Sequence, residues 1–157
     1  MQGGLGGVLN TASEGISFYK KLEDQSIKFY EELACNEKYA EGNETFLAFA
    51  KENKKHKAIV IMAYHYVITD AIEAGFGFQG LDENNYKLNT KYTEEMSYSD
   101  VLKMVIEIEK TTYKFCTDAG ETSKGLLHDI SNAFLRVAKQ KIKRKQKLKT
   151  LLEKILV

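Results

Sequence analysis

Polar residues interrupt the apolar repeat of several segments at positions where a helix would face inward. The segment Phe46–His56 reads FLAFAKENKKH, and its apolar side recurs every three to four residues. Asn53 and His56 fall on that side, together with the two phenylalanines of the segment. Amide and imidazole groups inside a helical protein can hydrogen-bond to other buried groups, and an imidazole can also bind a metal ion. These positions are the first candidates for chemistry in this chain.

The same pattern occurs a second time. Phe134–Arg144, which reads FLRVAKQKIKR, aligns with the first segment without a gap, and Lys141 and Arg144 take the places of the amide and the imidazole. Glu23 and Glu109 each lie in the middle of the apolar stripe of a preceding segment. The chain therefore consists of two copies of one helical hairpin. Each hairpin has an inward glutamate on its first helix and two inward polar positions on its second.

This layout has a well-defined chemical use. Four helices with inward carboxylates and histidines can hold two metal ions between them. In such di-iron bundles two helices each supply one glutamate, and each of the other two supplies a Glu-x-x-His pair. The repeated hairpin thus marks a candidate metal centre.

The composition favours helices in one domain. The 157 residues include 43% hydrophobic and 29% charged residues and no proline, so nothing stops long helical runs internally. This length suits one domain with a single core. We expect an all-α domain over residues 11–157, preceded by a disordered, glycine-rich tail over residues 1–10.

Capping residues and glycines delimit four expected helices. Ser13 is a candidate N-cap for the first helix, and Ser97 with Asp100 matches a capping box at the start of the third. A glycine-rich stretch follows the second helix. The expected ranges are 13 to about 36, 43 to about 74, a third helix from 97, and 123 to 156.

A long connection separates the two hairpins. Residues 75–97 have no sustained periodicity, and at about 3.3 Å per extended residue they can cross the length of a helical bundle. We therefore expect helix one to pair antiparallel with helix two, and helix three with helix four. The connection between helices two and three is expected to run along the whole bundle.

The segments LEDQSIKFYEELA and IEIEKTTYKFC, each with its following FxxxA segment, resemble the two hairpins of rubrerythrin-like members of the ferritin-like superfamily. The resemblance covers residues 16 to about 152. It implies an up-down four-helix bundle with a long crossover, a di-iron site, and oxidoreductase chemistry on oxygen or peroxide. In that family the glutamate seven residues before a tyrosine is a metal ligand. Glu23 precedes Tyr30 by this spacing, and Glu109 precedes Cys116.

The chain departs from this family at three of the four Glu-x-x-His positions. His56 matches, but Asn53 and Lys141 stand where the family has glutamates, and Arg144 stands where it has a histidine. Glu52 matches a frequent neighbour of the ligand and is expected to point about 100° away from the site. The rubredoxin-like module that often accompanies the family holds iron through four cysteines, and this chain has two.

The inward groups favour salt bridges over metal. Two carboxylates, one amide, one imidazole and two cations leave little negative charge for two metal ions. We expect Glu23 to pair with Lys141 and Glu109 with Arg144, so that the cations take the place of the metal and no cofactor is bound. The alternative is a reduced site that binds one iron through Glu23, His56 and Glu109. In a third arrangement the fourth helix is rotated, and both cations reach solvent.

Several of these residues also fit a purely structural role. A lone inward His56 can be a hydrogen-bonded core histidine. Tyr19, Tyr30, Tyr64, Tyr66 and Tyr113 can fill the core, with their hydroxyls bonded to the polar centre. Cys116 is expected to be an inert buried thiol.

The run Lys139–Lys149, which reads KQKIKRKQKLK, is strongly basic in a chain whose net charge is only +1. It can bind an anionic partner such as nucleic acid, membrane phosphate or an acidic protein. It can also be the solvated face of a long helix, which we favour. No aromatic residues interleave with the lysines, and this argues against nucleic acid.

Three classes of function compete. We favour a non-catalytic structural or interaction protein that has lost its di-iron chemistry. The second class is an iron-binding oxidoreductase with an altered site of one or two metals, and the third is an anion-binding protein that acts through the basic face of helix four. Two distant cysteines and the lack of an apolar run of about 18 residues favour a reduced, cytoplasmic protein without a membrane span. We also expect a homo-oligomer, a dimer.

Overall fold

Helices make up the regular structure of the described part of the chain. The computed structural model describes residues 7–67, 81–124 and 128–156. These residues contain four long α-helices and two short 3-10 helices, which in chain order are α1 (Ala12–Cys35), η2 (Glu37–Gly42), α2 (Asn43–Val67), η3 (Glu83–Tyr86), α4 (Tyr98–Ser123) and α5 (His128–Leu156). The predicted all-α class is confirmed. None of the described helices combines the length and the apolar content that a bilayer crossing requires.

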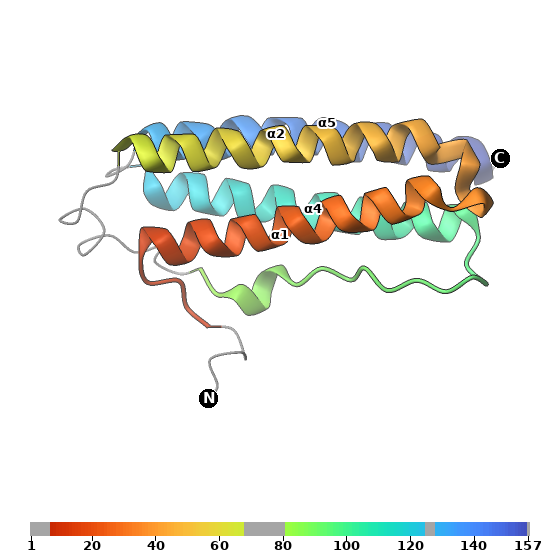
Figure 1. The fold of residues 1–157 in the computed structure, drawn as a ribbon, viewed down its shortest axis with the longest axis horizontal. Coiled ribbons are helices and arrows are strands. Elements are labelled where there is room, and N and C mark those ends of the chain that lie inside the picture. Colours follow the sequence, from red (N-terminus) through yellow and green to blue (C-terminus); the bar gives the residue numbers. More distant parts are fainter. Residues whose placement is uncertain (1–6, 68–80, 125–127, 157) are drawn as a thin grey trace.

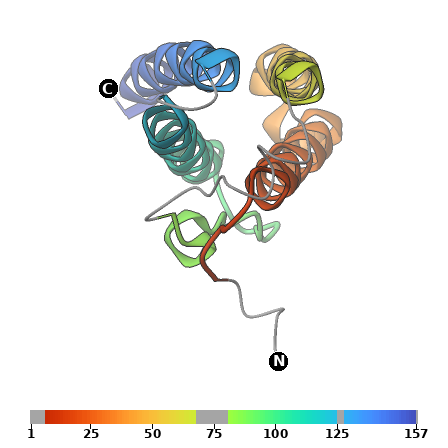
Figure 2. The same ribbon diagram turned by 90° about the vertical axis from the view of Figure 1, so that its left-hand side faces the viewer.

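The four long helices pack side by side as two antiparallel hairpins. α1 packs on α2, and α4 packs on α5 (Figure 1). Contacts of α2 with α5 and of α1 with α4 join the hairpins, so that the four helices surround one axis (Figure 2). α2 and α4 run in the same direction, which obliges the chain to return along the bundle between them (Figure 1). The predicted pairing of the helices is the one observed.

The described part of the connection, residues 81–97, extends along the bundle on the side of α1 and α4 (Figure 1). Tyr86 is buried there, with its ring packed against Phe18 and Phe115. This course agrees with the predicted crossover. Residues 75–80 of the predicted connection lie outside the described residues.

Residues 7–10 are ordered, in contrast to the disordered tail expected from the glycine content. The Leu9 N–H donates to the Leu81 carbonyl at 3.0 Å, and the Glu83 N–H donates to the Gly7 carbonyl at 3.0 Å. Leu9 is buried in the core. Apolar burial and paired backbone groups offset the entropy cost of ordering this short segment. Residues 1–6 of the expected tail lie outside the described residues.

The start of α1 differs from the prediction. Thr11, and not Ser13, is the N-cap: the Thr11 hydroxyl accepts from the Glu14 N–H at 3.1 Å, and the Glu14 carboxylate accepts from the Thr11 N–H at 3.0 Å. This reciprocal pair satisfies two backbone donors, whereas a cap at Ser13 would have no glutamate three residues later. The threonine therefore begins the helix two residues early.

The bounds of the other helices agree in part. The capping box of Ser97 and Asp100 is present at the start of α4. Ser123 does not begin the last helix; it belongs to the end of α4, where its hydroxyl donates to the Ala119 carbonyl at 2.7 Å, and α5 begins at His128. The predicted end of the second helix near Ala74 lies outside the described residues.

The core consists of two apolar clusters separated along the bundle axis. The first cluster contains buried residues of α1 as far as Leu22 and of α5 as far as Ala138. The second contains buried residues of α1 from Ile27 onward, and Leu148 of α5. Buried polar and charged residues occupy the interval between them on all four helices. The fold therefore holds one polar layer at its middle, and that layer contains the candidate site.

Candidate functional site

The polar layer contains all six residues that the helical repeat predicted to face inward. Four are fully buried, and the exposed fractions of Arg144 and His56 are 5% and 7%. The third arrangement considered for the sequence, in which a rotated last helix turns its cations to solvent, is therefore wrong. The six residues are Glu23 of α1, Asn53 and His56 of α2, Glu109 of α4, and Lys141 and Arg144 of α5.

The Lys141 side chain extends from α5 and contacts both α1 and α2. Its Nζ donates to Glu23 Oε1 at 2.7 Å and to Asn53 Oδ1 at 3.0 Å. The other oxygen of Glu23 accepts a hydrogen bond from the Tyr19 hydroxyl at 2.5 Å. The predicted pair of Glu23 and Lys141 is thus present, with both side chains fully buried. A charge pair without contact to water needs such additional hydrogen bonds to offset its desolvation.

Arg144 makes the predicted ion pair with Glu109 and also makes contacts that were not predicted. Its Nη1 lies 3.5 Å from Glu109 Oε1, close enough for an ion pair but not hydrogen-bonded to it. Nη1 donates instead to Asn53 Oδ1 at 2.5 Å, and Nη2 donates to Glu52 Oε1 at 2.9 Å. The guanidinium carbon also lies 4.6 Å from the centre of the Phe49 ring. Arg144 therefore bridges the polar layer and the edge of the bundle.

Glu52 points away from the buried site, as expected, but its carboxylate still contacts Arg144. On a regular helix it does lie about 100° from Asn53. That direction faces α5, where Arg144 can reach it, and the Glu52 side chain keeps 52% of its surface exposed. The carboxylate therefore joins the network from outside.

Tyrosines complete the shell of the two carboxylates. The Tyr30 hydroxyl donates to Glu109 Oε2 at 2.5 Å across the interface of α1 and α4, as Tyr19 does to Glu23 within α1. Burial raises the pKa of both tyrosines well above the ordinary value, and the neighbouring carboxylate charges raise it further. Both hydroxyls therefore remain protonated and serve as donors. The predicted role as core fillers bonded to the polar centre is confirmed for Tyr19 and Tyr30, and it is wrong for Tyr66, whose exposed fraction is 88%.

Glu109 is the less satisfied of the two carboxylates. Its Oε1 has no hydrogen-bond partner among the described residues, although the Arg144 guanidinium lies nearby.

Cys116 is fully buried, and burial raises the pKa of its thiol. A protonated, inaccessible thiol is a poor nucleophile. This agrees with the inert role predicted for it.

One member of the network was not singled out from the sequence. Ser26 accepts a hydrogen bond from Asn53 Nδ2 at 3.0 Å and donates to the Glu23 carbonyl at 2.8 Å. Its signal was its place on the inward stripe three residues after Glu23, where an apolar residue would be ordinary. Asn53 thus donates a hydrogen bond to Ser26 of α1 and accepts hydrogen bonds from Lys141 and Arg144 of α5. A glutamate at this position could not donate in the same way.

His56 faces the positive end of the network. Burial, together with the charges of Lys141, Arg144 and Arg136, lowers the pKa of its imidazole to about 3. The ring is therefore neutral at physiological pH. Its Nδ1 has no hydrogen-bond partner in the described part of the chain, so the expected hydrogen-bonded core histidine is not observed at that atom.

Acid should destabilise the protein through His56. Between pH 6.5 and about 3 the unfolded chain binds a proton on this ring that the folded chain does not bind. The free energy of unfolding should therefore fall as the pH drops below 6.5, by about 2 kcal/mol at pH 5 from this group alone. Urea unfolding at pH 7 and at pH 5 measures the loss. His56→Gln cannot titrate and should lose about 2 kcal/mol less; an equal loss in both proteins would contradict this account.

The polar layer does not fit a di-iron centre. Among the described residues, no three or more histidine, cysteine, aspartate or glutamate side chains group closely enough to hold a metal ion. The Lys141 ammonium contacts the Glu23 carboxylate, and the Arg144 guanidinium approaches Glu109. Each of the two buried carboxylates is thus paired with a cation of the protein, whereas a metal centre would need anionic ligands at these positions.

The basic run of the last helix divides between two environments. Lys141 and Arg144 are buried in the polar layer, while Lys139, Lys143 and Lys147 are exposed. The solvated face expected within Lys139–Lys149 is therefore formed by the exposed lysines, while Lys141 and Arg144 face inward as predicted. The exposed part of the run remains free to meet a partner.

Comparison of the chain with protein-family models, with curated proteins and with solved structures finds no match. Its function must therefore be argued from the residues of the site itself.

Proposed function

We propose that this chain is a rubrerythrin-like, ferritin-like bundle in which internal salt bridges replace the di-iron site. In this proposal it serves as a non-catalytic structural or interaction protein. The observation that carries the proposal is the buried contact of 2.7 Å between Lys141 Nζ and Glu23 Oε1. A cation supplied by the protein lies against the carboxylate that the resemblance assigns to the metal.

The arrangement of the helices supports the ferritin-like part of the proposal. Two antiparallel hairpins place one glutamate each, Glu23 and Glu109, in the same central layer. The described connection runs along the bundle between the second and third long helices (Figure 1). These are the features that the resemblance implies, and the repeated sequence of the hairpins provides them.

The charge balance supports the loss of metal. Glu23 and Glu109 contribute two negative charges, Lys141 and Arg144 contribute two positive charges, and His56 is neutral. The internal layer is therefore neutral without any added ion. A divalent ion bound here would have to displace or tolerate two adjacent cations, which costs Coulomb energy in a buried site.

The shifted pKa values support a non-catalytic role. A general acid or base works best with a pKa near the working pH. In this layer the pKa values of Tyr19, Tyr30 and Cys116 move upward, and that of His56 moves downward to about 3. Each of these four groups thus moves away from the range in which it could exchange protons with a substrate.

Iron content tests the proposal directly. Protein produced with ample iron should carry no stoichiometric iron, because Lys141 and Arg144 already neutralise the two carboxylates. Elemental analysis of the purified protein, scaled to protein concentration, is the measurement. A content near two irons per chain would overturn the proposal, and a content near one would favour the alternative site of Glu23, His56 and Glu109.

A further inference from the structure

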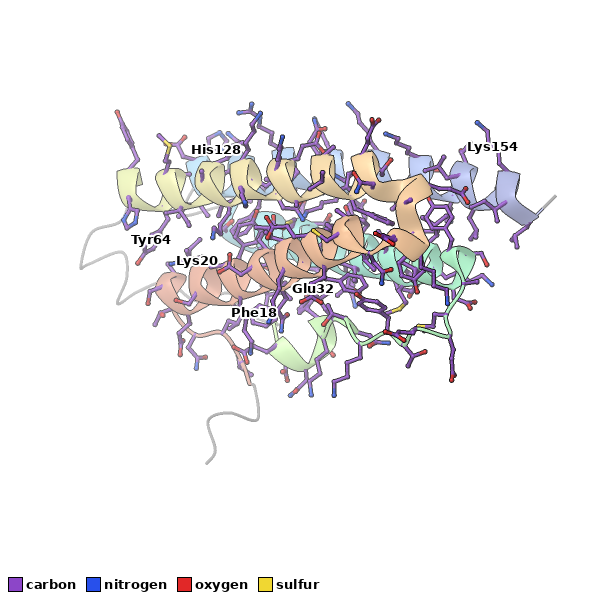
Figure 3. All side chains as sticks on the ribbon, turned by 45° about the vertical axis from the view of Figure 1, so that its right-hand side comes forward. Phe18, Lys20, Glu32, Tyr64, His128 and Lys154 are labelled. Atoms are coloured by element: carbon purple, nitrogen blue, oxygen red, sulfur yellow. The ribbon has the colours of Figure 1, made fainter. Side chains whose placement is uncertain are left out.

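The outer side of α5 carries a row of exposed cations. Successive members are separated by three, four, four and seven residues, so they share one side of the helix. The row extends about 27 Å at the helical rise of 1.5 Å per residue. Figure 3 shows nitrogen-tipped side chains along the outer side of α2 and α5, with Lys154 near the end of α5. The members are Arg136, Lys139, Lys143, Lys147 and Lys154.

α2 widens this row into a face. The ion pair of Glu52 with Arg144 shows which side of α2 lies next to α5. Lys55 follows Glu52 by three residues and is exposed on that side. We name Lys55 and the five cations of α5 the basic face.

The described residues do not neutralise the charges of the basic face. In the described residues no ion pair involves any of its six members. Other exposed lysines do have partners: Lys54 pairs with Glu31, and Lys57 pairs with Asp24. Glu52, the acid nearest the centre of the face, is already paired with Arg144. The face therefore presents uncompensated positive charge in a protein of net charge +1.

Two large apolar side chains adjoin the basic face. Met62 and Tyr66 follow Lys55 by seven and eleven residues and so share its side of α2. Their exposed fractions are 71% and 88%, the highest among the large hydrophobic residues described. A methionine side chain is costly to leave in water, and tyrosine is favoured at the boundary between water and a bilayer.

We infer that the basic face binds the surface of a bilayer that contains anionic lipids. Cations on two neighbouring helices can meet a plane of negative headgroups together, and Tyr66 and Met62 can enter the boundary layer beside them. Nucleic acid fits less well. Single strands are held by aromatic rings interleaved with the charges, whereas Tyr66 lies on the other helix and the row on α5 contains no aromatic residue.

Vesicle binding tests this inference. Cosedimentation is measured with vesicles of phosphatidylcholine alone and of phosphatidylcholine with phosphatidylserine, at low and at high salt. The protein should bind only the anionic vesicles, and salt should weaken the binding. Lys139→Glu, Lys143→Glu and Lys147→Glu together should weaken it at least about 100-fold, since each charge contributes about fivefold.

The matched control carries the same charge change on another helix. Lys20, Lys21 and Lys28 are exposed on α1, and their triple change to glutamate should leave vesicle binding within about threefold of the parent through the altered net charge alone. Circular dichroism confirms that both variants fold. Equal loss in the two variants, or no binding of the parent to anionic vesicles, would overturn the inference.

Two further measurements separate a bilayer from nucleic acid. Tyr66→Ser should reduce vesicle binding by several-fold even at high salt, because it removes an apolar contribution that salt does not screen. Titration of a DNA duplex and of a single strand should show at least tenfold weaker binding than the anionic vesicles at equal salt. Tighter binding to either DNA, or no effect of Tyr66→Ser on vesicles, would overturn the bilayer in favour of a polyanion.

Discussion

Lys141→Ala should lower the free energy of unfolding by about 3–5 kcal/mol. The substitution leaves Glu23 fully buried, with the Tyr19 hydroxyl still donating to one oxygen and no cation at the other. It also removes the Nζ donor from Asn53 Oδ1. An unpaired carboxylate in the interior costs more than the net stability of the pair, because the desolvation is no longer offset. Urea unfolding monitored by circular dichroism measures the change.

Lys139→Ala is the matched control. It lies two residues earlier on α5 and is exposed, so its loss should change stability by less than about 0.5 kcal/mol. The double variant Glu23→Gln with Lys141→Met removes both charges and should be more stable than Lys141→Ala alone. Similar stability of Lys141→Ala and Lys139→Ala would show that Lys141 is not held inside the bundle.

Rebuilding the ligand set should convert the polar layer into an iron site. Asn53→Glu, Lys141→Glu and Arg144→His together supply one glutamate from each of two helices and Glu-x-x-His from each of the other two. The internal charge changes from two carboxylates against two cations to four carboxylates with two histidines, which matches two divalent ions. We expect about two irons per chain in this variant and no stoichiometric iron in the parent protein.

The variant should also depend on metal for its stability. Four buried carboxylates without cations repel one another, so the metal-free variant should unfold readily or remain unfolded. Added ferrous iron should raise its melting temperature, and a chelator should reverse the effect. Adding Glu23→Gln to the triple variant removes one ligand and should reduce iron binding. Absence of iron binding in a folded triple variant would contradict the assigned register of α5.

The sequence by itself determined which residues face inward. Helical spacing placed Glu23, Asn53, Glu109, Lys141 and Arg144 on apolar stripes, and a stripe must be buried wherever the helix packs. It also determined the two hairpins, since the inward positions occur twice in the same register. These conclusions required only the period of the α-helix and the cost of exposing apolar side chains.

Only the tertiary structure decided the hydrogen-bond partners of the inward groups beyond the two predicted ion pairs. The helical period assigns a side but not the rotamer of a long side chain or the relative rotation of two helices. Arg144 thus adds Asn53 and Glu52 to its ion pair with Glu109, and Tyr30 bonds to Glu109 on another helix. Such contacts join residues 79 to 92 positions apart, where no local pattern can specify a distance of about 3 Å. The inward side follows from local spacing, whereas the pairing depends on how four helices pack together.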